Sequence, residues 1–281
     1  MSMIYPDEFL EVRVCCIDFP LPDTTLCAGY DGGVWRAAGV ADHLFQWLPY
    51  VALNQESQLS FGKHNFLEML SVAAAHIYNT KKTESRGELG ELLLHIACVQ
   101  VFKTIPVLCK LILKTSSNDT VKGFDGVHVV VKNDGFELWL GESKFYSDPK
   151  KAIRDAVKSV REHIVPSFLT VEKAMLIGHV AKDIPRRDEI IHLFKSQTSG
   201  DKLLDVSVFP VFIAYESETV SSFEKLSEKY VEELRGEVSK LKVYFKDKVE
   251  NLPLRFQLIF FPMASKSDVI EGFDKKLKAF V

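Results

Sequence analysis

The spacing of apolar residues divides the chain into helical and extended segments. Apolar positions recur at steps of three and four where one helix face is buried, whereas strands show short runs of β-branched and aromatic residues. Helical spacing predicts two helices within 34–80 and one each at 86–114, 150–164, 219–249 and 267–280. Short strands and turns are expected in 1–33, and longer strands at 173–180, 206–216 and 254–263. Pro106 should kink or divide the helix expected at 86–114.

Residues 124–146 carry a strong hairpin signal. Two apolar runs flank Asn133-Asp134-Gly135, and an Asp-Gly pair between β-formers favours a tight turn. Leu138 and Leu140 point to one face of the second strand, and Trp139 points to the other. Apolar residues on both faces are typical of a central strand that helices cover on both sides.

The order of these elements predicts the α/β class. Asp148 is expected to cap the helix at 150–164, with Pro149 in its first turn. Helix, hairpin, helix and then further strands and helices predict a mixed central β-sheet flanked by helices. We divide the chain into an N-terminal α/β region at 1–80, packed on a core at 81–281; because no linker separates them, a single domain is the alternative.

The composition is that of an ordinary globular protein. Of the 281 residues, 47% are hydrophobic and 26% are charged, which excludes disordered, collagen-like and coiled-coil chains. No apolar run approaches the ~18 residues of a membrane-spanning helix. The N-terminus lacks the basic start and apolar core of a signal peptide, so we expect a cytoplasmic protein. The five cysteines form no Cys-x-x-Cys pair, which favours reduced thiols over disulfides or a zinc site.

The net charge of −3, from 35 basic and 38 acidic residues, lacks the basic excess typical of nucleic-acid-binding proteins. A local basic face could still supply the attraction. One candidate lies opposite the apolar face of the helix at 150–164 and consists of Lys150, Arg154, Lys158 and Arg161. These side chains are either an ordinary solvated face or a contact surface for phosphates.

Candidate chemistry lies at the end of the second hairpin strand, Gly141-Glu142-Ser143-Lys144. Side chains alternate along a strand, so Glu142 and Lys144 share the face of Leu138 and Leu140. An apolar strand therefore places a carboxylate beside an ammonium group. Burying charge is costly unless the charge is paired or bound to a metal ion. The pair is either a structural salt bridge or part of a reactive site.

A second carboxylate belongs to the same end of the hairpin. Asp125 starts the first strand, nine residues before the turn at 134–135, and Glu142 lies seven residues after it. Two carboxylates facing one cleft can hold a hard divalent cation through oxygen ligands. Lys144, two residues further on, can orient an attacking water or stabilise developing negative charge. The alternative for Asp125 is a turn-forming role beside Gly123 and Gly126.

An acidic residue that starts one strand, followed by Glu-x-Lys at the end of the next, resembles the core of PD-(D/E)xK nucleases. The resemblance implies a restriction-endonuclease-like fold. Such nucleases carry a further acid on an upstream helix, and Glu88 or Glu91 in Arg86-Gly87-Glu88-Leu89-Gly90-Glu91 occupies that place. Phe124 rather than proline precedes Asp125, at a position that varies within the superfamily.

Three segments together, RGELGELLLH, GFDGVHVV and ELWLGESKFY, are similar to the HamA family of Hachiman antiphage-defence systems. The resemblance is detailed over residues 86–165 and covers the rest in outline. It implies a DNA nuclease that acts with a helicase partner, HamB. Asp125, Glu142 and Lys144 would be the catalytic residues. The Mg²⁺ ligands, with Mn²⁺ as a possible substitute, would be Asp125, Glu142, the Ser143 carbonyl and either Glu88 or Glu91.

Other interpretations stay open. The chain could be a catalytically inactive nuclease-like scaffold that only binds DNA or a partner protein. Cys98 and His95 lie three residues apart on one helix and could form a cysteine hydrolase, although no orienting acid or oxyanion-hole motif accompanies them. His95 and His128 are more simply structural. The chain has no P-loop, so an ATP-driven motor would have to come from another subunit.

Overall fold

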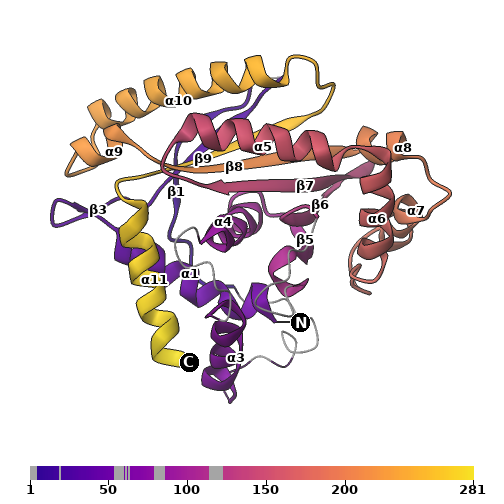
Figure 1. The fold of residues 1–281 in the computed structure, drawn as a ribbon, viewed down its shortest axis with the longest axis horizontal. Coiled ribbons are helices and arrows are strands. Elements are labelled where there is room, and N and C mark those ends of the chain that lie inside the picture. The colour runs from indigo at the N-terminus through magenta and orange to yellow at the C-terminus, as the bar shows by residue number, and fades with distance from the viewer. Residues whose placement is uncertain are drawn as a thin grey trace.

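A mixed β-sheet forms the centre of the molecule (Figure 1). The computed structural model describes residues 5–18, 20–53, 60, 62, 64–78, 86–113 and 123–281. Within these residues, seven strands follow the order β1-β2-β9-β8-β7-β6-β5. The strands are β1 (Glu11–Cys16), β2 (Asp23–Cys27), β5 (Ile105–Cys109), β6 (Gly126–Lys132), β7 (Gly135–Phe145), β8 (Ser207–Glu216) and β9 (Phe256–Met263). Strands β2, β9, β8 and β7 run parallel, and the remaining pairs are antiparallel. The predicted α/β fold with a mixed central sheet is confirmed.

Helices cover both faces of this sheet, as the hairpin pattern predicted. The helices are α1 (Ala37–Ala52), α3 (Phe66–Tyr78), α4 (Gly87–Gln100), α5 (Pro149–His163), α6 (Pro166–Ile177), α7 (Arg187–Phe194), α8 (Gly200–Asp205), α9 (Glu218–Ser222), α10 (Glu228–Val249) and α11 (Lys266–Phe280). Figure 1 shows α5 and α10 on one side of the sheet, with α4 on the other and α1, α3 and α11 beyond it. A separate short pair, β3 (Tyr30–Asp31) and β4 (Val34–Trp35), lies beside α1 in the sequence.

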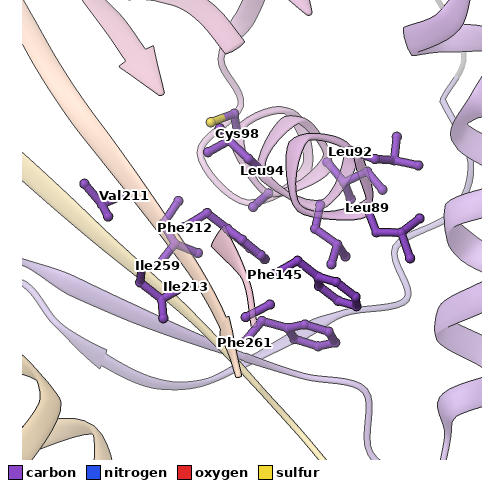
Figure 2. Packing of buried hydrophobic residues seen from close by; sticks show 14 of the residues in the cluster. Leu89, Leu92, Leu94, Cys98, Phe145, Val211, Phe212, Ile213, Ile259 and Phe261 are labelled. Carbon is purple, nitrogen blue, oxygen red and sulfur yellow. The ribbon is translucent and has the colours of Figure 1, made fainter. Parts of the chain in front are cut away.

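Helix α4 packs against the middle of the sheet. Its side chains from Glu88 to Gln100 are all buried, as expected for a helix that is apolar around most of its circumference. Figure 2 shows Leu89, Leu92 and Leu94 gathered with Phe145 of β7 and with residues of β8 and β9. Gly141 of β7 permits this close packing, because a Cβ there would lie 2.7 Å from Leu94 Cδ2.

The N-terminal residues share the central sheet with the C-terminal ones. Strand β2 pairs in parallel with β9, with Thr24 opposite Ile259. Helices α1 and α3 pack on α11. The boundary expected near residue 80 falls outside the described residues, and the division into two units stays a prediction.

The structure corrects the prediction of one helix over 86–114. Helix α4 ends at Gln100, and residues 105–109 form strand β5 at the edge of the sheet, followed by a 3₁₀ turn at Lys110–Leu113. A short apolar run fits a helix and a strand equally well, so its pairing with β6 decides the outcome. Pro106 lacks an N–H group and is tolerated because β5 is an edge strand.

Two further predictions on the C-terminal side were wrong. Most of the strand expected at 173–180 belongs instead to α6, which runs from Pro166 to Ile177 and buries Leu169 and Leu176. The single helix expected at 219–249 is two helices, α9 and α10. Helix α9 ends at Ser222, where Phe223 adopts an extended conformation, and the Ser227 side chain accepts a hydrogen bond from Tyr230 N and caps the start of α10. The 206–216 and 254–263 strands, the 267–280 helix and the Asp148 cap are confirmed.

None of the described helices is both long and apolar enough to cross a membrane.

Candidate active site

The candidate site lies beside the start of β6, where the antiparallel strand β7 extends beyond its last residue paired with β6. The last paired residues of this hairpin are Gly126 and Gly141, so β7 beyond Gly141 lacks a partner on the β6 side. The Asp125 carboxylate binds this edge of β7 directly. Its Oδ2 atom accepts hydrogen bonds from Ser143 N at 2.9 Å and from Ser143 Oγ at 2.8 Å. The structure thus links Asp125 directly to the Glu142-Ser143-Lys144 segment.

Glu142 and Lys144 project from the face of β7 that α5 covers. Lys144 Nζ donates a short hydrogen bond to Glu142 Oε1 and a second one, of 3.2 Å, to the Ser143 carbonyl. The other carboxylate oxygen of Glu142 lies 3.5 Å from Nδ1 of His163, the last residue of α5. The structure therefore brings Asp125, Glu142 and Lys144 together, and their catalytic role stays a prediction.

Lys110 is a member of the site that the sequence did not reveal. It follows β5, and its ammonium group lies 3.2 Å from Asp125 Oδ1 and 3.2 Å from the Gly123 carbonyl oxygen. Our sequence prediction placed this residue on a helix, and no local motif connects it with the hairpin. Only the pairing of β5 with β6 brings Lys110 to Asp125.

His163 and Glu172 also escaped prediction. His163 extends the buried face of α5, since it lies three residues after Val160 and seven after Ala156, and that spacing was a usable signal. Glu172 of α6 is buried, and its Oε1 accepts a hydrogen bond of 3.2 Å from the backbone N–H of Phe124. It gave no signal, because the sequence favoured a strand there.

Burial and neighbouring charges shift the pKa values of the Asp125 and Glu142 carboxylates in opposite directions. Burial alone would raise the pKa of Asp125, but Lys110, Lys144 and the hydrogen bonds from Ser143 outweigh it and hold that pKa below its usual value. Burial raises the pKa of Glu142 to about 7, and the Asp125 charge adds to the shift. The pKa values of both lysines are raised: burial opposes this shift, but the surrounding carboxylates outweigh it. Both ammonium groups are therefore charged at neutral pH.

The two candidate acids of α4 occupy different surroundings. Glu88 Oε1 accepts a hydrogen bond of 2.8 Å from Arg86, which also contacts Asp274 of α11 at 2.5 Å. Glu91 lies near enough to Lys110 to help raise the pKa of its ammonium group. Glu91 rather than Glu88 is therefore the α4 acid on the side of the site.

The basic residues predicted on α5 lie on an exposed surface that α10 shares. Arg154 Nη1 donates to Tyr244 Oη at 3.3 Å, and Lys248 Nζ lies 4.9 Å from the centre of the Tyr244 ring. We call this surface the α5–α10 basic face; it consists of the half-buried Tyr244 and the exposed residues Lys150, Arg154, Lys158, Arg161 and Lys248. Sequence reasoning found its α5 half and missed the half on α10.

Burial argues against a hydrolase built on Cys98 and His95. The Cys98 side chain is fully buried, and burial raises the pKa of its thiol, which disfavours the thiolate. His95 packs 4.9 Å from the His128 ring, and His128 contacts Thr104 Oγ1 at 2.8 Å on Nδ1. Both histidines are core residues, as expected. None of the five cysteines forms a disulfide bond.

Replacing His95 by phenylalanine should make the chain less sensitive to acid. Burial lowers the pKa of His95 to about 4, whereas an unfolded chain protonates histidine near 6.5. The unfolded state therefore binds the extra proton as pH falls from about 6.5 to about 4, and stability is lost over this range. The parent should lose up to about 3 kcal/mol from this residue, which the variant keeps.

The measurement is the difference in urea unfolding free energy between variant and parent at pH 7, 5.5 and 4.5. A difference is needed because Glu142 and Glu172, whose pKa values are both raised by burial to about 7, act in the opposite sense over the same range. The exposed His76→Phe is the control. A difference that does not change with pH contradicts the prediction.

The donor atoms of the site suit a hard cation only in part. Glu142 Oε2 is buried and accepts no hydrogen bond from the residues that the structure describes, which leaves one carboxylate oxygen unsatisfied among them. Asp125 and the Ser143 carbonyl lie beside it and supply further oxygens, the atoms that Mg²⁺ prefers. However, in the part of the chain that the structure describes, no three His, Cys, Asp or Glu side chains converge as a ready cage for a metal ion.

The fold is that of an α/β protein with a mixed central sheet flanked by helices, which is consistent with a nuclease-like core. The HamA family model matches residues 3–277, nearly the whole chain. The chain therefore belongs to the HamA family, whose membership indicates a protein of Hachiman antiphage defence. No curated protein matches the chain.

Proposed function

We propose that this chain is a metal-dependent DNA nuclease, the effector subunit of a defence complex with a HamB-like helicase. One observation carries the proposal: the Asp125 carboxylate binds the backbone of the Glu142-Ser143-Lys144 segment where β6 gives way to β7. The family supports the defence role, and the helicase partner follows from the resemblance.

Each site residue has a role in this proposal. Asp125, Glu142 and the Ser143 carbonyl would hold Mg²⁺, with Mn²⁺ as a substitute, and Glu91 would add negative charge beside Lys110. A cation bound there supplies activation of water and stabilisation of the leaving oxygen. Lys144, held between Glu142 and the Ser143 carbonyl, would orient the attacking water or neutralise the charge that develops on the phosphate.

The test is the double variant Glu142→Ala/Lys144→Ala in the assembled complex with its helicase. Supercoiled and linear DNA are incubated with Mg²⁺, and products are followed on gels. The double variant should cut neither substrate while it still assembles with the partner. A double variant that cuts as fast as the parent shows that this site is not the nuclease centre.

A catalytically inactive scaffold is the second candidate. It draws support from the self-pairing of the site charges, Lys144 with Glu142 and Lys110 with Asp125. A scaffold binds DNA without metal dependence and shows no saturable uptake of Mg²⁺ or Mn²⁺. Calorimetric titration of both ions into parent and Glu142→Ala/Lys144→Ala separates the two functions.

Neutralising the α5–α10 basic face should weaken binding to all DNA sequences alike. Lys150→Ala/Arg154→Ala removes two cations from around Tyr244, and each lost phosphate contact makes the dependence of log K on log salt shallower by about 0.9. The slope should therefore fall by about 2 in fluorescence anisotropy titrations at several salt concentrations. Lys225→Ala/Lys229→Ala, at and just before the opposite end of α10, is the control. An unchanged slope means that DNA does not contact this face.

A further inference from the structure

The position of Asp125 depends on a short segment that belongs to no regular element. Gly123-Phe124-Asp125 precedes β6, and its own ladder contacts are those of Asp125 with Gly141 and Lys110. The Asp125 side chain can meet Ser143 only if this segment keeps its path. Two side chains from outside the segment hold it in place.

Lys110 holds the segment from the side of β5. Its backbone N–H donates to the Asp125 carbonyl at 3.1 Å, and its ammonium group reaches both the Gly123 carbonyl and Asp125 Oδ1 at 3.2 Å. One side chain thus fixes the start of the segment and the orientation of the carboxylate at its end. The Lys110 side chain is only 16% exposed, so water competes weakly for these bonds.

Glu172 holds the segment from the side of α6. Its Oε1 accepts the Phe124 N–H at 3.2 Å, and its Oε2 would lie 3.0 Å from a Cβ at position 123. Gly123 has a φ of +155° and no side chain, so it lets the carboxylate approach the backbone. The Phe124 ring is buried beside His163 and Phe168, which closes the remaining side.

We propose that Lys110 and Glu172 are positioning residues that clamp the Gly123-Phe124-Asp125 segment, and so set the Asp125 carboxylate for cation binding. The cation role rests on the proposed function, whereas the clamp itself is a property of the fold. Both residues act through Asp125 and contact neither cation nor DNA. The role of Glu172 is to accept a backbone N–H, which a glutamine oxygen can also do.

This distinction gives a sharp test with the full chain. Glu172→Leu removes the acceptor, whereas Glu172→Gln keeps an oxygen of the same reach. Hydrogen exchange of the amides in 123–128 should be about tenfold faster or more in Glu172→Leu and near the parent rate in Glu172→Gln. Mn²⁺ affinity should fall about tenfold to a hundredfold in the leucine variant alone, as is typical when a residue supporting a metal ligand is lost. Exposed Glu189→Leu is the control.

Lys110→Met is the independent second variant, and it should speed exchange in the same peptide. It also serves if Glu172→Leu fails to fold. Exchange in 123–128 that stays at the parent rate in Glu172→Leu and Lys110→Met overturns the clamp. A glutamine variant as impaired as the leucine variant overturns the assigned role of Glu172, since the charge itself is then required. If the parent neither binds Mn²⁺ nor cuts DNA, the proposed function fails while the exchange result still decides the clamp.

Discussion

Glu142→Gln is expected to reduce Mg²⁺-dependent DNA cleavage by about a hundredfold to a thousandfold without destabilising the fold. Burial and the Asp125 charge raise the pKa of Glu142 to about 7, so the charged form is unfavourable in the absence of a cation. Glutamine has the same shape and can still accept the hydrogen bond from Lys144. The substitution therefore removes the unfavourable free energy of burying a charged carboxylate. It also removes the negative charge that would bind the cation.

Loss of cleavage without loss of stability distinguishes a functional carboxylate from a structural one. If Glu142 served only as the salt-bridge partner of Lys144, glutamine would lower stability and leave any activity intact. The measurements are plasmid cleavage by the complex and urea unfolding of the isolated chain. Glu137→Gln is the matched control, because Glu137 lies on the same strand and binds Arg255 at the surface. Undiminished cleavage by Glu142→Gln contradicts the assignment.

The second large effect concerns stability. Arg86→Ala is expected to lower the unfolding free energy by about 3–5 kcal/mol, because it leaves the buried Glu88 and the half-buried Asp274 without their counter-charge. Arg86 is 1% exposed and bridges Glu88 of α4 and Asp274 of α11. Its guanidinium also lies 3.5 Å from the Ile77 carbonyl at the end of α3. One side chain therefore joins three helices.

Arg186→Ala is a closely matched control. Arg186 also precedes a helix, also has a positive φ, 59° against 40° for Arg86, and also binds a nearby glutamate, Glu189. This pair lies at the surface, where water and salt screen an ion pair and its contribution to stability is small. The measurement is the urea unfolding free energy of both variants. If unfolding free energy depends on urea concentration with the same slope in both, the difference isolates the effect of burial. Equal losses in the two variants mean that the Arg86 network contributes no more than a surface pair.

Local signals explain which elements the sequence predicted well. The hairpin follows from Asp134-Gly135, and α5 follows from the Asp148 cap with Pro149, because both signals act within a few residues. Strand β5 and helix α6 lack such signals. Their short apolar runs fit either conformation, and contacts with distant segments decide between them.

The same division holds for the site. Asp125, Glu142 and Lys144 belong to one hairpin, so turn position and side-chain alternation suffice to bring them together. Lys110, His163 and Glu172 come from three other elements, β5 with its 3₁₀ turn, α5 and α6. The sequence predicted β5 and α6 incorrectly in part, so it could not place Lys110 and Glu172 at the site. The exception is His163, whose place on the buried face of α5 could have been noticed.

The insertion of β9 between β2 and β8 has a consequence for synthesis on the ribosome. Residues 256–263 are made long after β2, yet β2 pairs with them in parallel and β1 pairs with β2. Strands β1 and β2 must therefore wait until β9 has left the ribosome before they can join the central sheet. By contrast, residues 105–172 include the hairpin and every member of the site outside α4. A nascent chain can thus assemble the hairpin early and complete its sheet only once β9 has emerged.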